Sequence, residues 1–108
     1  MPLDKAKLQL MFQNEAMNRL ETLKRDWALL AEDFGNTEAL ESALGELHTL
    51  KGTALMLEAK EIADKCESLE LELKPVAKDG PGDVDALLEK ARASTIEIEQ
   101  LVHALNLG

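Results

Sequence analysis

Residues 37–56, TEALESALGELHTLKGTALM, carry the clearest structural pattern in the chain. Apolar residues recur here at steps of three and four, the spacing that places side chains on one face of an α-helix. They are Leu40, Ala43, Leu47, Leu50 and Ala54, and Leu57 continues the spacing just beyond the stretch. Asn36 or Thr37 can serve as the N-cap, because a side-chain oxygen there accepts from a free backbone N–H of the first turn. We therefore predict an amphipathic helix over residues 37–56.

Three further segments have the same spacing of apolar residues. They cover roughly residues 5–33, 59–77 and 83–106. Strong helix formers dominate all of them, and runs of β-branched residues, which favour strands, are absent. Four amphipathic helices joined by short connections are typical of an antiparallel bundle. We expect an all-α fold, an up-down-up-down antiparallel four-helix bundle, formed as one domain by residues 1–108.

The connections between these helices differ in how clearly the sequence marks them. Residues 35–37, GNT, mark the first, and residues 78–83, KDGPGD, mark the third, with Asp83 as the next N-cap. The second connection, around residues 56–59, contains neither glycine nor proline, so its boundary is open. Pro75 should kink or end the third helix near Lys74, because it lacks a backbone N–H and its ring clashes with the preceding turn.

The composition excludes several classes of function. The net charge is −9, and an acidic chain repels nucleic acid and anionic membrane surfaces. No apolar run approaches the roughly 18 residues that span a bilayer, and the N-terminus lacks the pattern of a signal peptide. The single cysteine, Cys66, can form no internal disulfide and suits a reducing compartment. We expect a cytoplasmic protein that binds neither nucleic acid nor membrane.

Metal and nucleotide sites have little support in the sequence. His48 and His103 are the two histidines, and no cysteine pair accompanies them, so a typical zinc ligand set is missing. His103 reads as a surface residue near a helix C-terminus, and Cys66 as a packed thiol. No glycine-rich phosphate loop is present, so the chain should not bind ATP by itself. We expect no metal and no cofactor.

Residues 45–54, GELHTLKGTA, place two glycines inside the predicted second helix, each costing roughly 1 kcal/mol relative to alanine. At about 100° per residue, His48 points roughly 130° away from the apolar face. Gly45 and Gly52 lie three residues before it and four after it, so they are its neighbours on the helix surface. The glycines either clear space for a partner to approach His48, or let another helix pack closely beside an ordinary surface histidine.

Two charged residues can assist His48 if its imidazole is a nucleophile. Lys51, one turn along, can offset the charge of a phosphoryl group on the ring. A carboxylate that accepts from Nδ1–H would leave the lone pair of Nε2 free to attack. The third helix offers Glu67, which faces solvent, and Glu70, which lies at the edge of the core and is our choice. The alternative is that Lys51 and Glu70 are ordinary solvated residues.

The residues around His48, and those of the first predicted helix, resemble a known family. The stretch from His48 to Ala54, HTLKGTA, is similar to the H-x-x-K-G-[small]-[small] signature of histidine phosphotransfer domains. Residues 12–23, FQNEAMNRLETL, resemble the first helix of the phosphotransfer domain of chemotaxis histidine kinases, and Glu70 stands at the distance of that family's glutamate. One departure is the sequence after the motif, LMLEAK over residues 55–60, where the family often has a glycine-rich turn.

The resemblance implies a phosphocarrier. His48 would accept a phosphoryl group from a histidine kinase catalytic domain or a regulator and pass it to an aspartate of a response regulator receiver domain. The regulator would dock through a face whose members are Leu44, Gly45, Gly52, Leu55 and Met56. We expect a monomer that is not an enzyme by itself, either free-standing or part of a kinase. The alternative from another class is a structural or docking bundle that is never phosphorylated.

Overall fold

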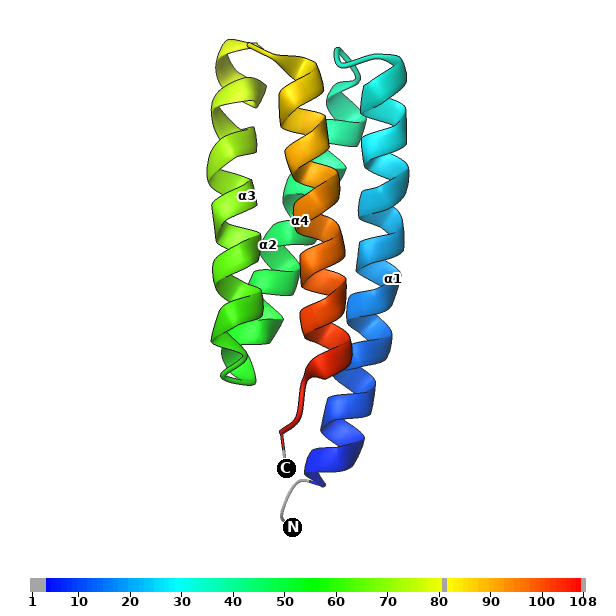
Figure 1. Ribbon diagram of the computed structural model, residues 1–108, viewed down its shortest axis with the longest axis vertical. Coiled ribbons are helices and arrows are strands. Elements are labelled where there is room, and N and C mark those ends of the chain that lie inside the picture. The colour runs from blue at the N-terminus through cyan, green and yellow to red at the C-terminus, as the bar shows by residue number, and fades with distance from the viewer. Residues whose placement is uncertain (1–3, 81, 108) are drawn as a thin grey trace.

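The computed structural model describes residues 4–80 and 82–107, and these form four helices and no strand (Figure 1). The helices are α1 (Lys5–Glu32), α2 (Thr37–Met56), α3 (Lys60–Asp79) and α4 (Val84–Ala104). They alternate in direction along a bundle that measures 49 × 20 × 20 Å. The predicted all-α, up-down-up-down bundle is confirmed. The expected domain range also includes residues 1–3, 81 and 108, which lie outside the described residues, as does the proline of the third connection.

The core is built from the apolar faces of all four helices. Its largest fully buried side chains are Trp27, Leu20, Leu23, Leu30, Leu47, Leu50, Leu69, Leu73, Ile98 and Val102. One polar link lies within this core: Trp27 Nε1–H donates to Thr95 Oγ1 at 2.9 Å, and Thr95 donates onward to the Ala91 carbonyl at 2.7 Å. Because both buried donors have hydrogen-bond partners, Trp27 fixes α1 against α4 and neither donor is left unsatisfied.

A second polar link joins α1 to α2. Asp26 is only 5% exposed and accepts a hydrogen bond of 2.7 Å from Ser42 Oγ. Burial raises the pKa of the Asp26 carboxyl, and the bond from Ser42 offsets part of that rise. Sequence periodicity did not reveal this pair, because a carboxylate on the apolar side of a helix looks like an interruption of the pattern.

Side-chain caps begin three of the four helices. Asp4 accepts from Ala6 N–H and Lys7 N–H, and Asn36, the first of the two predicted candidates, accepts from Ala39 N–H. The predicted cap Asp83 accepts from the backbone of Ala86. Helix α3 differs, since Ala59 precedes it and offers no side-chain hydrogen bond.

Of the two effects expected of Pro75, an end to the third helix near Lys74 is wrong, because α3 continues to Asp79. A kink at this position stays a prediction. Pro75 lies one turn from the helix end and is exposed. It therefore removes a single ladder bond, to the carbonyl of Leu71, on a side of the helix where water can reach that carbonyl. Helix α3 ends two residues beyond the predicted residue 77, and α4 ends two residues short of the predicted residue 106.

The turn between α2 and α3 closes without glycine. Glu58 adopts a φ of 60°, in the left-handed region. Ala59 N–H donates to the Ala54 carbonyl at 2.8 Å, and Glu58 N–H donates to the Leu55 carbonyl at 3.1 Å. These two bonds are the pair that defines a Schellman C-cap, in which the left-handed position is usually glycine. The tight turn brings α3 back alongside α2, where it faces His48.

Candidate functional site

The middle of α2 presents His48 to solvent. Its imidazole is 73% exposed, and both flanking glycines are exposed as well. Among the described residues, a Cβ added at Gly45 or Gly52 would meet no atom within 4 Å beyond the backbone of its own helix. The alternative in which these glycines allow another helix to pack closely is therefore wrong. They leave bare backbone on both sides of an outward-facing imidazole.

Helix α3 brings a buried carboxylate against this exposed ring. Glu70 has a side chain that is only 3% exposed, and its Oε2 lies 3.6 Å from His48 Nδ1. This separation is slightly longer than a hydrogen bond, so a small movement of the ring would complete one. Glu67, the other candidate, is exposed. The structure thus places the predicted glutamate beside the predicted nitrogen, and leaves Nε2 on the other side of the ring.

Lys51 also turns toward Glu70. Its Nζ lies 3.2 Å from Glu70 Oε1, and its side chain is 20% exposed. Oε1 is buried and makes no hydrogen bond within the described part of the chain, because the ion pair with Lys51 lacks hydrogen-bond alignment. Lys51 is therefore not an ordinary solvated lysine. It offsets the charge of a carboxylate that burial would otherwise strongly disfavour.

A second lysine, Lys74, completes the cluster, and the sequence analysis did not predict it. Its Nζ lies 3.6 Å from Glu70 Oε2, the oxygen that faces His48. The Lys74 side chain is 59% exposed, so its position is set by attraction more than by packing. The spacing of four residues between Glu70 and Lys74 on a predicted helix could have revealed it, since such pairs face each other.

The thiol beneath this cluster is chemically quiet. Cys66 is fully buried one turn before Glu70 on α3. Burial raises its pKa to about 12, the negative charge of Glu70 adds to the rise, and the charge of Lys51 opposes it. A thiol that stays protonated is neither a nucleophile nor a metal ligand. Cys66 is the packed thiol that the sequence predicted.

The residues predicted to dock a partner surround His48 unevenly. Leu55 is 55% exposed and Met56 is 84% exposed, so both offer apolar surface. Leu44 is half-buried and packs against the core. These three residues, with Gly45 and Gly52, form a face of α2 that we call the His48 face. His103 lies on the exposed side of α4 and is not part of this face.

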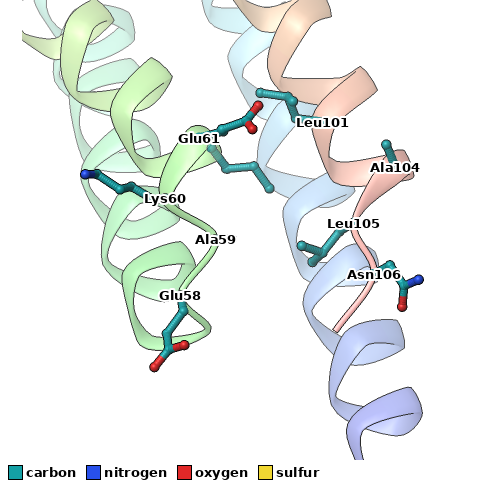
Figure 2. Close-up of a pocket in the computed structure, with 9 residues that line it drawn as sticks. Glu58, Ala59, Lys60, Glu61, Leu101, Ala104, Leu105 and Asn106 are labelled. Carbon is teal, nitrogen blue, oxygen red and sulfur yellow. The ribbon is translucent and has the colours of Figure 1, made fainter. Parts of the chain in front are cut away.

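The exposed His48 lies apart from the hollow at one end of the bundle. Figure 2 shows this hollow between the α2–α3 turn with the start of α3 and the C-terminal end of α4. Its volume is about 520 Å³. Residues such as Glu58, Lys60 and Leu105 line it, whereas His48, Lys51 and Glu70 do not.

Within residues 4–80 and 82–107, no three His, Cys, Asp or Glu side chains group to hold a metal ion. No helix of that part is long and apolar enough to cross a bilayer.

Comparisons with known proteins agree with this geometry. The family model described as Hpt domain matches residues 7–106. The CheA phosphotransferase domain from Thermotoga maritima has a similar structure, with a TM-score of 0.89 and 24% sequence identity. That similarity covers 94% of this chain and 97% of the other, and shows a shared fold. The comparison with curated proteins found no significant match. The chain belongs to the Hpt, or histidine phosphotransfer, family, whose members carry phosphoryl groups in phosphorelay signalling.

Proposed function

We propose that His48 is the residue that carries the phosphoryl group. One observation carries the proposal: an imidazole 73% exposed has its Nδ1 3.6 Å from a carboxylate that is almost completely buried. A buried carboxylate beside an exposed ring is the arrangement that fixes a tautomer and leaves the outer nitrogen reactive. The glycines on either side of His48 leave room for a second protein to bring its own reacting group to that nitrogen.

The transfer step follows from this arrangement. The lone pair of His48 Nε2 attacks the phosphorus of the donor, a nitrogen–phosphorus bond forms, and the bond to the donor's leaving group breaks with its electron pair. The ring gains positive charge, and Nδ1–H donates to Glu70 Oε2, which stabilises that charge. In the second half, an aspartate oxygen of a receiver domain attacks the phosphorus, and the electron pair of the broken bond returns to Nε2.

Lys51 has a supporting role in this proposal. Its ammonium lies one helical turn from His48 and already sits 3.2 Å from Glu70. A phosphoryl group on the ring would add nearly two negative charges next to this carboxylate. The positive charge of Lys51 offsets both, which makes the phosphorylated state easier to form.

The partners of this reaction are a histidine kinase catalytic domain as donor and a response regulator receiver domain as acceptor. We propose that the receiver docks on the His48 face, where Leu55 and Met56 supply exposed apolar surface. The chain would act as a monomeric carrier in the cytoplasm and would not phosphorylate itself. Its single buried thiol is consistent with a reducing compartment.

Labelling with phosphate tests the assignment. An active kinase domain, or phosphoramidate as a small donor, should give an acid-labile and base-stable phosphate on the protein. His48→Gln should abolish this labelling and leave the helical circular dichroism intact. His103→Gln is the matched control and should label like the parent. Labelling that survives His48→Gln would move the site elsewhere, and a parent protein that never labels would favour a structural or docking bundle.

A further inference from the structure

The Oε2 atom of Glu70 has two cationic or potentially cationic neighbours. His48 Nδ1 and Lys74 Nζ each lie 3.6 Å from it. The other carboxylate oxygen, Oε1, is buried and faces Lys51 at 3.2 Å. His48 can therefore engage the carboxylate only through Oε2, the same atom that attracts Lys74.

The two neighbours of Oε2 affect one another through that oxygen. A carboxylate oxygen has two lone pairs, so it can accept from both groups at once. A cation beside it, however, withdraws part of its charge and makes it a weaker acceptor for a neutral ring N–H. The strength of the contact between His48 and Glu70 thus depends on where the exposed ammonium of Lys74 lies.

We propose that Lys74 is a positioning residue of the phosphotransfer site, one that competes with His48 for Glu70 Oε2. Its effect on phosphotransfer rests on the function proposed for His48, whereas the competition itself does not. While the Lys74 ammonium lies beside Oε2, this oxygen is a weaker acceptor for Nδ1–H, so the neutral ring of His48 populates both of its tautomers. Only the tautomer with hydrogen on Nδ1 has a lone pair on Nε2, so Lys74 holds down the fraction of rings that are ready to attack.

Ring tautomers measured by ¹⁵N NMR on the unphosphorylated protein test this competition. Lys74→Gln should raise the ratio of Nδ1–H to Nε2–H tautomers of His48 by about 1.5- to 5-fold, the range that an exposed ion pair is worth. Lys74→Arg keeps the cation and should restore the parent ratio. Lys78→Gln is the matched control: Lys78 is exposed one turn further along α3 and forms no ion pair among the described residues. In Lys78→Gln the ratio of the two His48 tautomers should equal that of the parent.

A double-mutant cycle distinguishes competition at Glu70 from a general effect of charge. In a Glu70→Gln background the shared carboxylate is gone, so Lys74→Gln should change the tautomer ratio no further. Circular dichroism would confirm that both backgrounds keep their helices. An unchanged ratio in Lys74→Gln would overturn the proposal. A change of the same size with and without Glu70 would also overturn it.

Labelling with phosphoramidate supplies the kinetic side of the test. In Lys74→Gln, kcat should rise in proportion to the fraction of rings in the Nδ1–H tautomer, which is a smaller factor than the change in the ratio, and KM should be unchanged because the donor does not bind Lys74. A raised KM with unchanged kcat would show that Lys74 holds the donor, which contradicts a positioning role. If the parent itself fails to label, the proposed function falls, while the tautomer comparison still decides whether Lys74 competes for Glu70.

Discussion

Helix α2 contains two glycines in its exposed middle, whereas the turn that ends it contains none. Gly45 and Gly52 lie in ordinary helix, where an added Cβ would meet no atom within 4 Å beyond the backbone of that helix, among the described residues. Glu58, in the turn, has a φ of 60°, where glycine is the residue with least strain. The chain therefore has glycine where the fold tolerates any side chain, and a glutamate where the fold favours glycine.

The difference separates requirements of folding from requirements of function. Each helical glycine costs roughly 1 kcal/mol relative to alanine, and a left-handed residue with a side chain costs about 1–2 kcal/mol. Selection for stability alone would exchange these residue types. Local costs of this kind are expected at functional sites, and the two glycines flank the one imidazole that stands beside a buried carboxylate. We infer that Gly45 and Gly52 serve whatever approaches His48 from outside.

The largest expected effect comes from filling this space. Gly52→Gln should keep the fold, because glutamine is a good helix former, but slow transfer to a receiver domain by about 10- to 100-fold, the effect of a clash worth 1–3 kcal/mol. Labelling by phosphoramidate should change much less, since that donor needs little room. The ratio of the two rates, measured for parent and variant, gives the test.

Ala93→Gln is the control for Gly52→Gln. Ala93 is exposed on α4, which among the described residues packs against α1 and α3 and not against α2. This variant should transfer to the receiver at nearly the parent rate. If Gly52→Gln also transfers at the parent rate, the glycine is not there for clearance. If it unfolds the bundle, a structural role for Gly52 has been overlooked.

The next effect is on stability. Gly45→Ala and Gly52→Ala should each raise the free energy of unfolding by up to about 1 kcal/mol, because alanine is the better helix former and its methyl has room. The two residues are two turns apart, so the double variant should gain close to the sum, about 2 kcal/mol. Urea unfolding measures both. A destabilised variant would mean that these glycines are needed by the fold after all.

Glu58→Gly examines the other half of the comparison. Glycine relieves the left-handed backbone but loosens the unfolded chain, so the net gain in the free energy of unfolding should be about 0.5–1 kcal/mol. Phosphate labelling should stay at the parent rate, because Glu58 is not in the His48 cluster. Loss of stability in this variant would show that Glu58 makes a contribution that outweighs its strained φ.

The smallest effect is expected at the buried Asp26 of α1, which accepts a hydrogen bond from Ser42 of α2. Its pKa is raised, chiefly by burial, so its neutral form stabilises the fold. That stability is present below the unfolded pKa and is lost as the pH rises through the folded pKa. Asp26→Asn mimics the neutral form and can still accept from Ser42. The free energy of unfolding of Asp26→Asn, relative to that of the parent, should be larger at pH 7 than at pH 4. An equal difference at the two pH values would contradict this account.

Apolar spacing predicted the four helices and most of the core, because a bundle repeats one local rule along its whole length. The same spacing extended the predicted third helix through Pro75 to residue 77. The rule that proline ends a helix did not apply there, since the cost of one lost bond depends on whether water reaches the freed carbonyl. Apolar spacing could not predict a left-handed Glu58, because the tertiary packing of α3 on α2 outweighs the local preference for glycine.

The sequence likewise predicted some residues of the candidate site and not others. His48, Lys51 and Glu70 were found because helical geometry and the family motif indicate which side chains share a surface. Lys74 lies outside the family motif and contacts Glu70 but not His48, so neither the motif nor the surroundings of the imidazole indicated it. Asp26 was missed because its partner Ser42 lies on another helix, and only the fold brings the two together.

The most direct measurement concerns which nitrogen carries the phosphate. The account requires that Glu70 Oε2, 3.6 Å from His48 Nδ1, accepts a hydrogen bond from Nδ1–H and so leaves the lone pair of Nε2 free to react. NMR of ¹⁵N-labelled protein after reaction with a kinase domain or phosphoramidate identifies the bonded nitrogen through its coupling to phosphorus. We predict a single phosphohistidine at His48 with phosphorus on Nε2 and hydrogen on Nδ1. Phosphorus on Nδ1, or on any other residue, would contradict the account.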